Sequence, residues 1–222
     1  MTLSRPLRYP FVVFDWDGTL ADSTAVIRRA LQRAAGDLGY PIPTDAQASY
    51  IIGMALRPAL EHAIPTLRES DLKPLTERYS HHFTSQENEI VLFDGVREML
   101  TALKGRGHWL AVATGKSRRG LDRAFDTLGL REFFMASRCA DEGFSKPHPG
   151  MLYALFEQTG MTAADTVMIG DTTHDLQLAE NAGAAAIGVT YGAHTPHLLE
   201  SHKSLTLVNS VSALSSFLST SA

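Results

Sequence analysis

A ten-residue stretch near the start of the chain constrains the fold more than any other feature. It reads Phe11-Val12-Val13-Phe14-Asp15-Trp16-Asp17-Gly18-Thr19-Leu20. Four consecutive apolar residues, rich in Val and Phe, predict a short strand buried on both faces. Two carboxylates follow at its carboxyl end, where open α/β sheets bind their ligands. Like charges about 4 Å apart repel by roughly 4 kcal/mol at an effective dielectric near 20, so a cation or a shared proton must compensate them. The alternative interpretation is an ordinary turn built on Asp17 and Gly18.

Composition limits the class of protein. The chain has 222 residues, 44% hydrophobic and 20% charged, which indicates an ordinary globular protein of one or two domains. A formal net charge of −4 lacks the basic surface expected of a nucleic-acid binder. No apolar run reaches 18 residues, so we expect no membrane span. Cys139 is the single cysteine and cannot form an internal disulfide, which favours a reducing, cytoplasmic location and a role as a small core residue.

The stretch from Asp22 to Glu89 carries helical patterns and no strand signal. One helix begins near Asp22, two short helices flank Gly53, and a longer amphipathic helix follows. A connection between two parallel strands needs only one helix, so this segment is too large to be a simple crossover. We therefore expect residues 22–89 to form an inserted, all-helical cap domain, and residues 1–21 and 90–222 to form the core domain.

From Ile90 onward, helices alternate with short apolar runs. The predicted strands after the first are 109–113, 133–136, 166–169 and 184–189, with 205–208 as a sixth. This alternation predicts an α/β fold with a doubly wound, mostly parallel sheet.

Polar residues follow several of these strands. Thr114 and Gly115 follow the second strand, Lys146 lies in the loop after the third, and Asp171 and Asp175 follow the fourth. Parallel strands point their carboxyl ends toward one edge of a doubly wound sheet. We therefore expect these residues to meet the first two aspartates in one site.

The chemistry predicted for this site is phosphoryl transfer assisted by a hard cation. Carboxylates without a His/Cys cluster favour Mg²⁺ and disfavour zinc. The Thr114 hydroxyl, the Gly115 amide and the Lys146 ammonium are donors suited to phosphate oxygens. Asp15 can act as a nucleophile that forms an aspartyl phosphate. Asp17 can protonate the leaving alkoxide and later accept a proton from the attacking water.

These motifs, in this order, resemble the four motifs of the haloacid dehalogenase-like (HAD) hydrolases, and the resemblance covers essentially the whole chain. It implies a Rossmann-like core, a nucleophile at Asp15 and an acid/base at Asp17. It also implies Mg²⁺ held by the Asp15 carboxylate, the Asp17 backbone carbonyl and Asp171, with Asp175 acting through water. The helical cap and the run Lys146-Pro147-His148-Pro149 are similar to the phosphoglycolate phosphatase branch.

Differences within the family favour a phosphatase. Dehalogenating members lack the second aspartate of the first motif, whereas Asp17 is present here. Sugar phosphomutases of the β-phosphoglucomutase type carry an arginine three residues after the cap-loop glycine. Leu56 occupies that position and Arg57 comes one residue later, which weakens the phosphomutase interpretation without removing it. A non-catalytic binding module on the same fold is the third alternative, and the complete set of motif residues argues against it.

Substrate choice is expected to lie in the cap loop, at Gly53 and Arg57. Arg57 either contacts a substrate carboxylate or second phosphate, or is an exposed residue at the start of a helix. His174 is expected to be exposed at a helix start, and no metal site is expected at His194, His197 and His202. The expected partner is a small phosphorylated metabolite, with phosphoglycolate, a nucleotide, a pyrophosphate and a sugar phosphate all open. We expect a monomer or weak homodimer.

Overall fold

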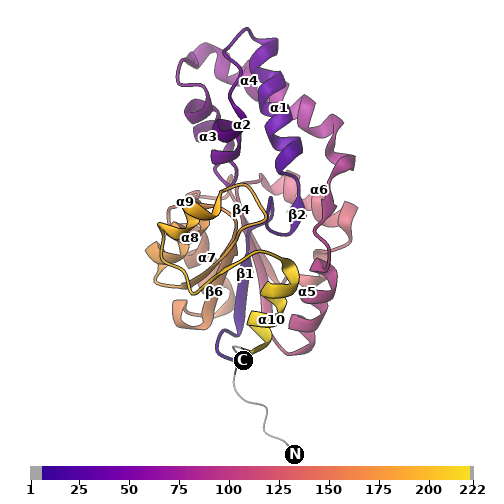
Figure 1. Ribbon diagram of the computed structural model, residues 1–222, viewed down its shortest axis with the longest axis vertical. Coiled ribbons are helices and arrows are strands. Elements are labelled where there is room, and N and C mark those ends of the chain that lie inside the picture. Colours follow the sequence, from indigo (N-terminus) through magenta and orange to yellow (C-terminus); the bar gives the residue numbers. More distant parts are fainter. Residues whose placement is uncertain (1–6, 221–222) are drawn as a thin grey trace, which may run out of the picture.

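A computed structural model describes residues 7–220 of the chain. Residues 1–6 and 221–222, which belong to the predicted core domain, lie outside the described residues. Figure 1 shows a sheet with flanking helices and, above its edge, a bundle of the helices α1–α4. Within the described residues, none of the helices combines the length and the apolar character that crossing a bilayer requires.

The main sheet has six strands in the order β5-β4-β1-β6-β7-β8, and each neighbouring pair runs parallel. The doubly wound, Rossmann-like α/β prediction is therefore confirmed. The first strand lies inside the sheet, between β4 and β6. The strands are β1 (Phe11–Phe14), β4 (Trp109–Thr114), β5 (Ala136–Cys139), β6 (Thr166–Gly170), β7 (Ala185–Val189) and β8 (Leu207–Val208).

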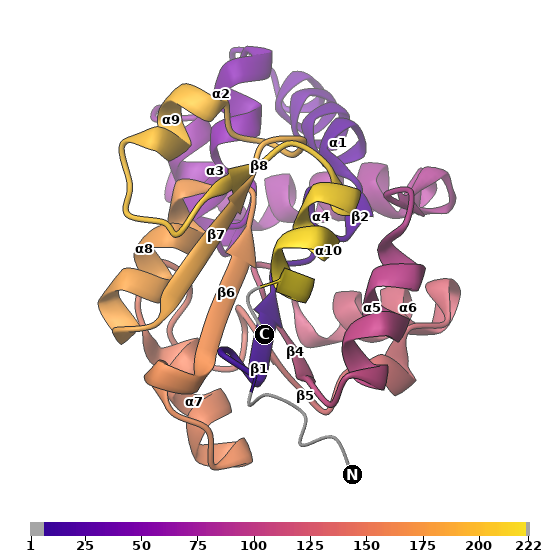
Figure 2. The ribbon, with the colours of Figure 1, turned by 60° about the horizontal axis from the view of Figure 1, so that its bottom comes forward.

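Side chains along β1 alternate between two apolar clusters, one on each face of the sheet. Helices cover both faces and bury these clusters. Val12 and Phe14 pack with α5 (Val96–Gly105), α6 (Arg118–Leu128) and α10 (Val211–Thr220). Phe11 and Val13 pack with helices of the opposite face (Figure 2). Those helices are α7 (Gly150–Thr159), α8 (Thr173–Ala182) and α9 (Pro196–Glu200).

The strand predicted at 133–136 is wrong, because β5 begins only at Ala136. The residues Arg131–Phe133 form a short 3₁₀ helix instead. The aromatic residues that suggested a strand serve the core: the Phe134 ring stacks on Phe125 with centroids 5.5 Å apart and lies edge-on to the buried Trp16 ring. The apolar residues 133–135 are therefore explained by packing in the core and not by a strand.

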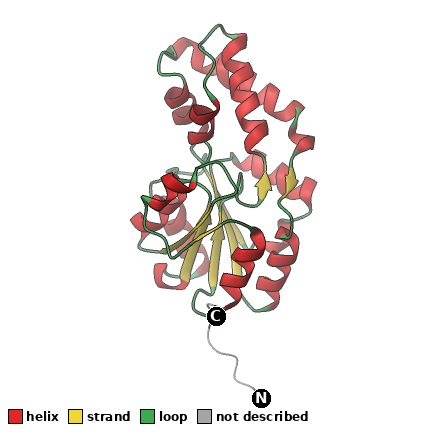
Figure 3. Ribbon diagram, in the orientation of Figure 1, coloured by secondary structure: helices red, strands yellow, loops and turns green. Residues whose placement is uncertain are grey.

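A small antiparallel sheet marks the place where the chain leaves and re-enters the core. It joins β2 (Ala21–Asp22) to β3 (Val91–Leu92), with Ala21 opposite Leu92 (Figure 3). Between these strands lie α1 (Thr24–Asp37), α2 (Asp45–Tyr50), α3 (Leu56–Ala63), α4 (Glu69–Ser85) and the 3₁₀ helix Glu87–Glu89.

We call residues 24–89 the helical subdomain. Its helices enclose one apolar cluster of their own, and they share a second, smaller cluster around Ile27 and Phe83 with Ile90 and Ala193 of the core. The fully buried side chains of Leu31 on α1, Leu60 on α3 and Leu75 on α4 meet in the larger of them. The helical content expected for this segment is therefore present, while its division from the core as a cap domain stays a prediction.

Candidate active site

Asp15 lies at the carboxyl end of β1 and is fully buried. Its backbone N–H donates to the carbonyl of Ile169 at 2.8 Å, which continues the pairing of β1 with β6. Its Oδ1 pairs with the ammonium of Lys146, and within residues 7–220 its Oδ2 has no hydrogen-bond partner. A buried carboxylate is costly, so nearby cations must compensate its charge.

Lys146 supplies part of the positive charge that compensates Asp15. Its Nζ lies 2.7 Å from Oδ1 of Asp15 and 2.6 Å from Oδ1 of Asp175, and its side chain is inaccessible to solvent. Burial alone would lower the pKa of Lys146, but the two carboxylates outweigh it and hold this pKa above its ordinary value. The loop after β5 thus contributes a fixed ammonium to the end of β1.

Asp175 holds this lysine in place through the cap of α8. Its Oδ2 accepts hydrogen bonds from the backbone N–H of Thr172 at 3.1 Å and from the Thr172 hydroxyl at 2.7 Å. This is a capping box: the side chain of Asp175, the third residue of α8, bonds back to Thr172, the residue that precedes the helix. The other oxygen is thereby aimed at Lys146, so helix capping and site geometry depend on the same side chain.

Asp171, directly after β6, is held by two donors. Thr19 Oγ1 donates to its Oδ1 at 2.8 Å, and the backbone N–H of Ala193 donates to its Oδ2 at 2.7 Å. Gly18, at φ +82°, and Gly192 both press against this carboxylate, and a Cβ at either position would overlap with it. Burial, reinforced by the charge of Asp175, raises the pKa of Asp171 to about 7.

The three carboxylates form one cluster. Asp15, Asp171 and Asp175 each offer an oxygen, and these oxygens all lie within 4.8 Å of one another. Burial raises the pKa of Asp15 well above its ordinary value; Lys146 opposes this shift, while Asp175 and Asp171 add to it. With all three carboxylates ionised, the single ammonium of Lys146 would leave two negative charges unbalanced. This excess, together with Oδ2 of Asp15, which has no hydrogen-bond partner among residues 7–220, fits a hard divalent cation with oxygen ligands.

Asp17 has different surroundings, although it is only two residues from Asp15. Its Oδ1 accepts a hydrogen bond from the Ser23 hydroxyl at 2.7 Å and lies 3.0 Å from Nζ of Lys116. The same ammonium lies 4.7 Å from the centre of the Phe83 ring on α4. Asp17 therefore faces the helical subdomain, whereas Asp15 faces the carboxylate cluster.

Lys116 is a site residue that the sequence analysis did not identify. It follows Thr114 by two residues, and that position after a central strand was the available signal. Thr114 is fully buried at the end of β4, and its hydroxyl accepts a hydrogen bond from the backbone N–H of Lys116 at 3.2 Å.

The loop between α2 and α3 reaches the core at this point. A Cβ on Gly115 would lie only 2.6 Å from the carbonyl oxygens of Gly53 and Met54. Gly53 itself has φ +87°, and a Cβ there would lie 3.9 Å from Oδ2 of Asp15. The structure therefore brings the predicted Gly53 to the site.

Arg57 lies elsewhere. Its guanidinium pairs with Glu61 and Glu69, each at 2.8 Å, and 58% of its side chain is exposed. Of the two expectations for this residue, the exposed position at the start of a helix matches the structure. The one-residue offset from the phosphomutase pattern thus places this cation on the outer face of α3, away from Asp15.

His174 is buried, contrary to its expected exposure. Its Nε2 and the Nε2 of His194 each lie 3.0 Å from the Tyr50 carbonyl oxygen, and the Tyr50 ring stacks on His194 with centroids 5.2 Å apart. The backbone N–H of Thr173 donates to Nδ1 of His194 at 3.1 Å. These two histidines join the end of α2 to the core. The position of His174 at the start of a helix predicts exposure, because it does not show that a distant segment covers this residue.

Known proteins resemble this chain over nearly its whole length. It is 36% identical over 209 residues to the "Probable phosphatase IndB" of Dickeya dadantii, covering 91% of this chain and 90% of that protein. It is 32% identical to the phosphoglycolate phosphatase of Agrobacterium fabrum, covering 85% and 83%. It is 35% identical to a 5'-nucleotidase of Pseudomonas aeruginosa, covering 89% and 90%.

The architecture also matches a solved structure. The crystal structure of "a predicted phosphatase from Clostridium acetobutylicum" superimposes with a TM-score of 0.85 and 25% identity, over 96% of this chain and 99% of that one. The family model described as "Haloacid dehalogenase-like hydrolase" matches residues 12–189, a span that contains each of the candidate site residues. The chain therefore belongs to the haloacid dehalogenase-like hydrolase family.

Proposed function

We propose that this hydrolase cleaves a small phosphate monoester through an aspartyl phosphate formed on Asp15, with Mg²⁺ as its cation. Its broad class, a phosphoric monoester hydrolase, follows from its family and its phosphatase relatives. The observation that carries the proposal is the buried Asp15 carboxylate, whose Oδ1 pairs with Lys146 while its Oδ2 has no hydrogen-bond partner among the described residues, in a cluster of three carboxylates.

In the first half-reaction, an oxygen of Asp15 attacks phosphorus, and the bond from phosphorus to the leaving oxygen breaks. Lys146, the Thr114 hydroxyl and the Gly115 amide are the donors proposed for the phosphoryl oxygens. Lys146 is already fixed within 2.7 Å of the nucleophile, so little reorganisation is needed to meet the charge that develops. Splitting the reaction at a covalent intermediate replaces one difficult step with two easier ones.

Asp17 handles the proton in both half-reactions. Protonated, it gives its proton to the leaving alkoxide; as a carboxylate, it then takes a proton from the water that attacks the aspartyl phosphate. That attack breaks the bond between phosphorus and Asp15 and releases inorganic phosphate. The separate surroundings of Asp17, turned toward Ser23 and Lys116, support a role different from that of Asp15.

The cation fits the cluster at Asp15 and Asp171, with the Asp17 backbone carbonyl as the third protein ligand that we propose. Both oxygens of Asp175 are engaged, by Lys146 and by Thr172, which supports an indirect role through water. Bound there, Mg²⁺ would neutralise carboxylate and phosphate charge that otherwise repels the nucleophile from phosphorus.

We also propose that the helical subdomain is a cap, with residues 22–89 as the inserted domain. The support is its loop at Gly53 and Met54, which packs against Gly115 beside the site, and the narrow β2–β3 junction. The exposed, paired Arg57 favours a phosphatase over a phosphomutase that would hold a second phosphate. A cytoplasmic location and a monomer or weak homodimer stay expectations.

Replacing the nucleophile should remove turnover. Asp15→Asn keeps the shape of the side chain but cannot attack phosphorus, so hydrolysis of p-nitrophenyl phosphate with Mg²⁺ should fall on the order of 10³-fold or more. Asp126→Asn, at a carboxylate that is 70% exposed on α6, is the matched control and should keep wild-type turnover. Wild-type turnover by Asp15→Asn would exclude this nucleophile.

Asp17→Asn should slow both the formation and the breakdown of the aspartyl phosphate, each by about 10²- to 10⁴-fold, because one group moves both protons. Acid-quenched samples taken after mixing with a labelled substrate measure the two phases. A phosphoenzyme that forms in this variant and decays at the wild-type rate contradicts the assigned role.

Gly115→Ala should separate the loop at Gly53 from the core, since its Cβ would press on two backbone carbonyls. A displacement of this kind should lower kcat/KM about 10- to 100-fold. The control is Gly105→Ala, at a position on α5 with no atom within 4 Å of the added Cβ. Equal kcat/KM for the two variants would show that the contact of the loop with Gly115 is not needed for catalysis.

Removing the metal should expose a pH dependence at Asp171. The folded chain holds this proton up to about pH 7, whereas the unfolded chain loses it near the ordinary value of 3.8. The stabilisation from this group is therefore present at low pH and is lost as the pH rises through about 7. Mg²⁺ needs the ionised carboxylate, so its stabilising effect should be larger at about pH 8.5 than at about pH 5.5.

Urea denaturation of chelator-treated protein, with and without added Mg²⁺, measures both effects. Asp171→Asn is neutral at every pH, so it should lose this pH dependence and most of the response to Mg²⁺. Identical responses to pH and Mg²⁺ in the variant and the wild type would contradict a titrating metal ligand at this position.

A further inference from the structure

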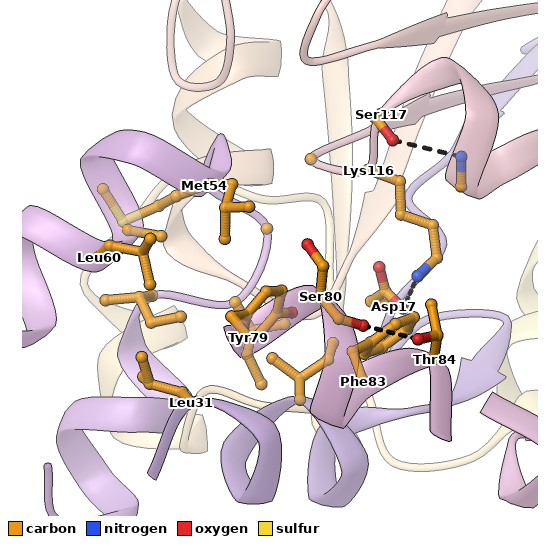
Figure 4. Close-up of a pocket in the computed structure, with 18 of the residues that line it drawn as sticks. Asp17, Leu31, Met54, Leu60, Tyr79, Ser80, Phe83, Thr84, Lys116 and Ser117 are labelled. Carbon is orange, nitrogen blue, oxygen red and sulfur yellow. Dashed lines mark hydrogen bonds and ion pairs between the residues drawn. The ribbon is translucent and has the colours of Figure 1, made fainter. Parts of the chain in front are cut away.

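A cavity of about 180 Å³ opens between the helical subdomain and the turn after β4. Its core side is lined by Asp17, by residues 115–117, and by Gly120 and Arg123 of α6. Residues of α1, α3, α4 and the loop at Gly53 line the other side, among them the polar Ser80 and Thr84 (Figure 4). Asp17 is the group proposed to protonate the leaving oxygen. The remainder of the leaving alcohol must continue from that oxygen, and this cavity is the space that begins at Asp17.

The wall that faces Asp17 is mainly apolar. Figure 4 shows Leu31, Met54 and Leu60 on one side of the cavity, and Asp17 with the Lys116 ammonium beside it on the other. Tyr79 adds an aromatic face, and burial raises the pKa of its hydroxyl above the ordinary value, so it stays neutral. The other apolar side chains in the lining are Ile27, Ile51, Ile52, Leu56, Ala59 and Phe83.

The cations of the lining are already engaged. Among the described residues around the cavity, these are Lys116, 3.0 Å from Asp17, and Arg123, 3.2 Å from Glu87. A carboxylate or second phosphate in the cavity would compete with Asp17 and Glu87 for these two cations and would otherwise lie in mainly apolar surroundings, which is unfavourable. Arg57, for which a contact to such a group was one of two alternatives, pairs instead with Glu61 and Glu69.

We infer that the substrate is a phosphate monoester of an apolar alcohol, whose hydrocarbon part occupies this cavity while its oxygen lies at Asp17. The inference rests on the proposed function and narrows it. An apolar cavity of 150 Å³ in another protein accommodates benzene, so one of about 180 Å³ suits an alkyl chain of several carbons or a single ring. Phosphoglycolate, with its carboxylate, is a poor match.

The test compares turnover across n-alkyl phosphates from ethyl to pentyl, with phosphoglycolate as the charged comparison. Burial of each added methylene should raise kcat/KM about fourfold until the cavity is full. Binding of the matching n-alkylphosphonates, measured by calorimetry with Mg²⁺, should strengthen by the same factor. A flat or falling series, or phosphoglycolate at least tenfold better than pentyl phosphate, overturns the inference.

A variant locates the effect. Ala59 lines the cavity and is buried on α3, so Ala59→Leu should lower the pentyl-to-ethyl ratio of kcat/KM at least tenfold. Ala63→Leu makes the same change one turn later on α3, at a buried position outside the cavity lining, and should leave the ratio unchanged. An unchanged ratio in a folded Ala59→Leu protein contradicts the inference, and the wild-type series decides if that variant fails to fold.

Failure of the inference and failure of the proposed function give different results. Hydrolysis of phosphoglycolate with a flat alkyl series leaves the function standing and removes the apolar substrate. Phosphonate binding that rises with chain length, without hydrolysis of any ester, supports the cavity assignment and removes the function. Absence of both binding and hydrolysis removes both.

Discussion

The buried charge cluster at the carboxyl end of β1 is the constraint on which the rest of the site depends. Asp15, Asp171 and Asp175 are fully buried around the single ammonium of Lys146. Removing such charges from water is costly unless each has a partner, so the surrounding elements must supply partners at fixed positions. The capping box of α8 and the donors Thr19 and Ala193 do so for two of the carboxylates. Of the three carboxylates, only Asp15 keeps an oxygen, Oδ2, without a hydrogen-bond partner among residues 7–220, which suits the nucleophile and metal ligand that we propose.

The two aspartates of the first motif, separated only by Trp16, have different partners. Asp15 at the strand end pairs with Lys146, whereas Asp17 pairs with Ser23 and Lys116 and faces the helical subdomain. One carboxylate thus meets the cluster and the other meets Lys116 and the cavity. Distinct surroundings for two carboxylates are the general way in which one site assigns different proton chemistry to them.

The helical subdomain contributes shape rather than charge. The loop at Gly53 lies against Gly115, and the Tyr50 carbonyl at the end of α2 contacts His174 and His194. Apolar side chains of the subdomain line most of the cavity. Arg57 forms surface ion pairs with Glu61 and Glu69. Such exposed ion pairs typically contribute little to stability. In the function that we propose, this subdomain would therefore recognise the substrate by the form of the cavity rather than by a charged contact.

The order of elements and the strand-end residues could be read from the sequence, because buried parallel strands are continuous apolar runs and their carboxyl ends share one edge. The shared edge therefore predicts that Asp15, Lys146, Asp171 and Asp175 lie together, as they do. Tertiary structure alone decided the direction of Arg57, the burial of His174, the role of Lys116 and the late start of β5 at Ala136. Those outcomes depend on contacts between segments far apart in the chain, and neither local spacing nor periodicity encodes which distant side chain will lie opposite.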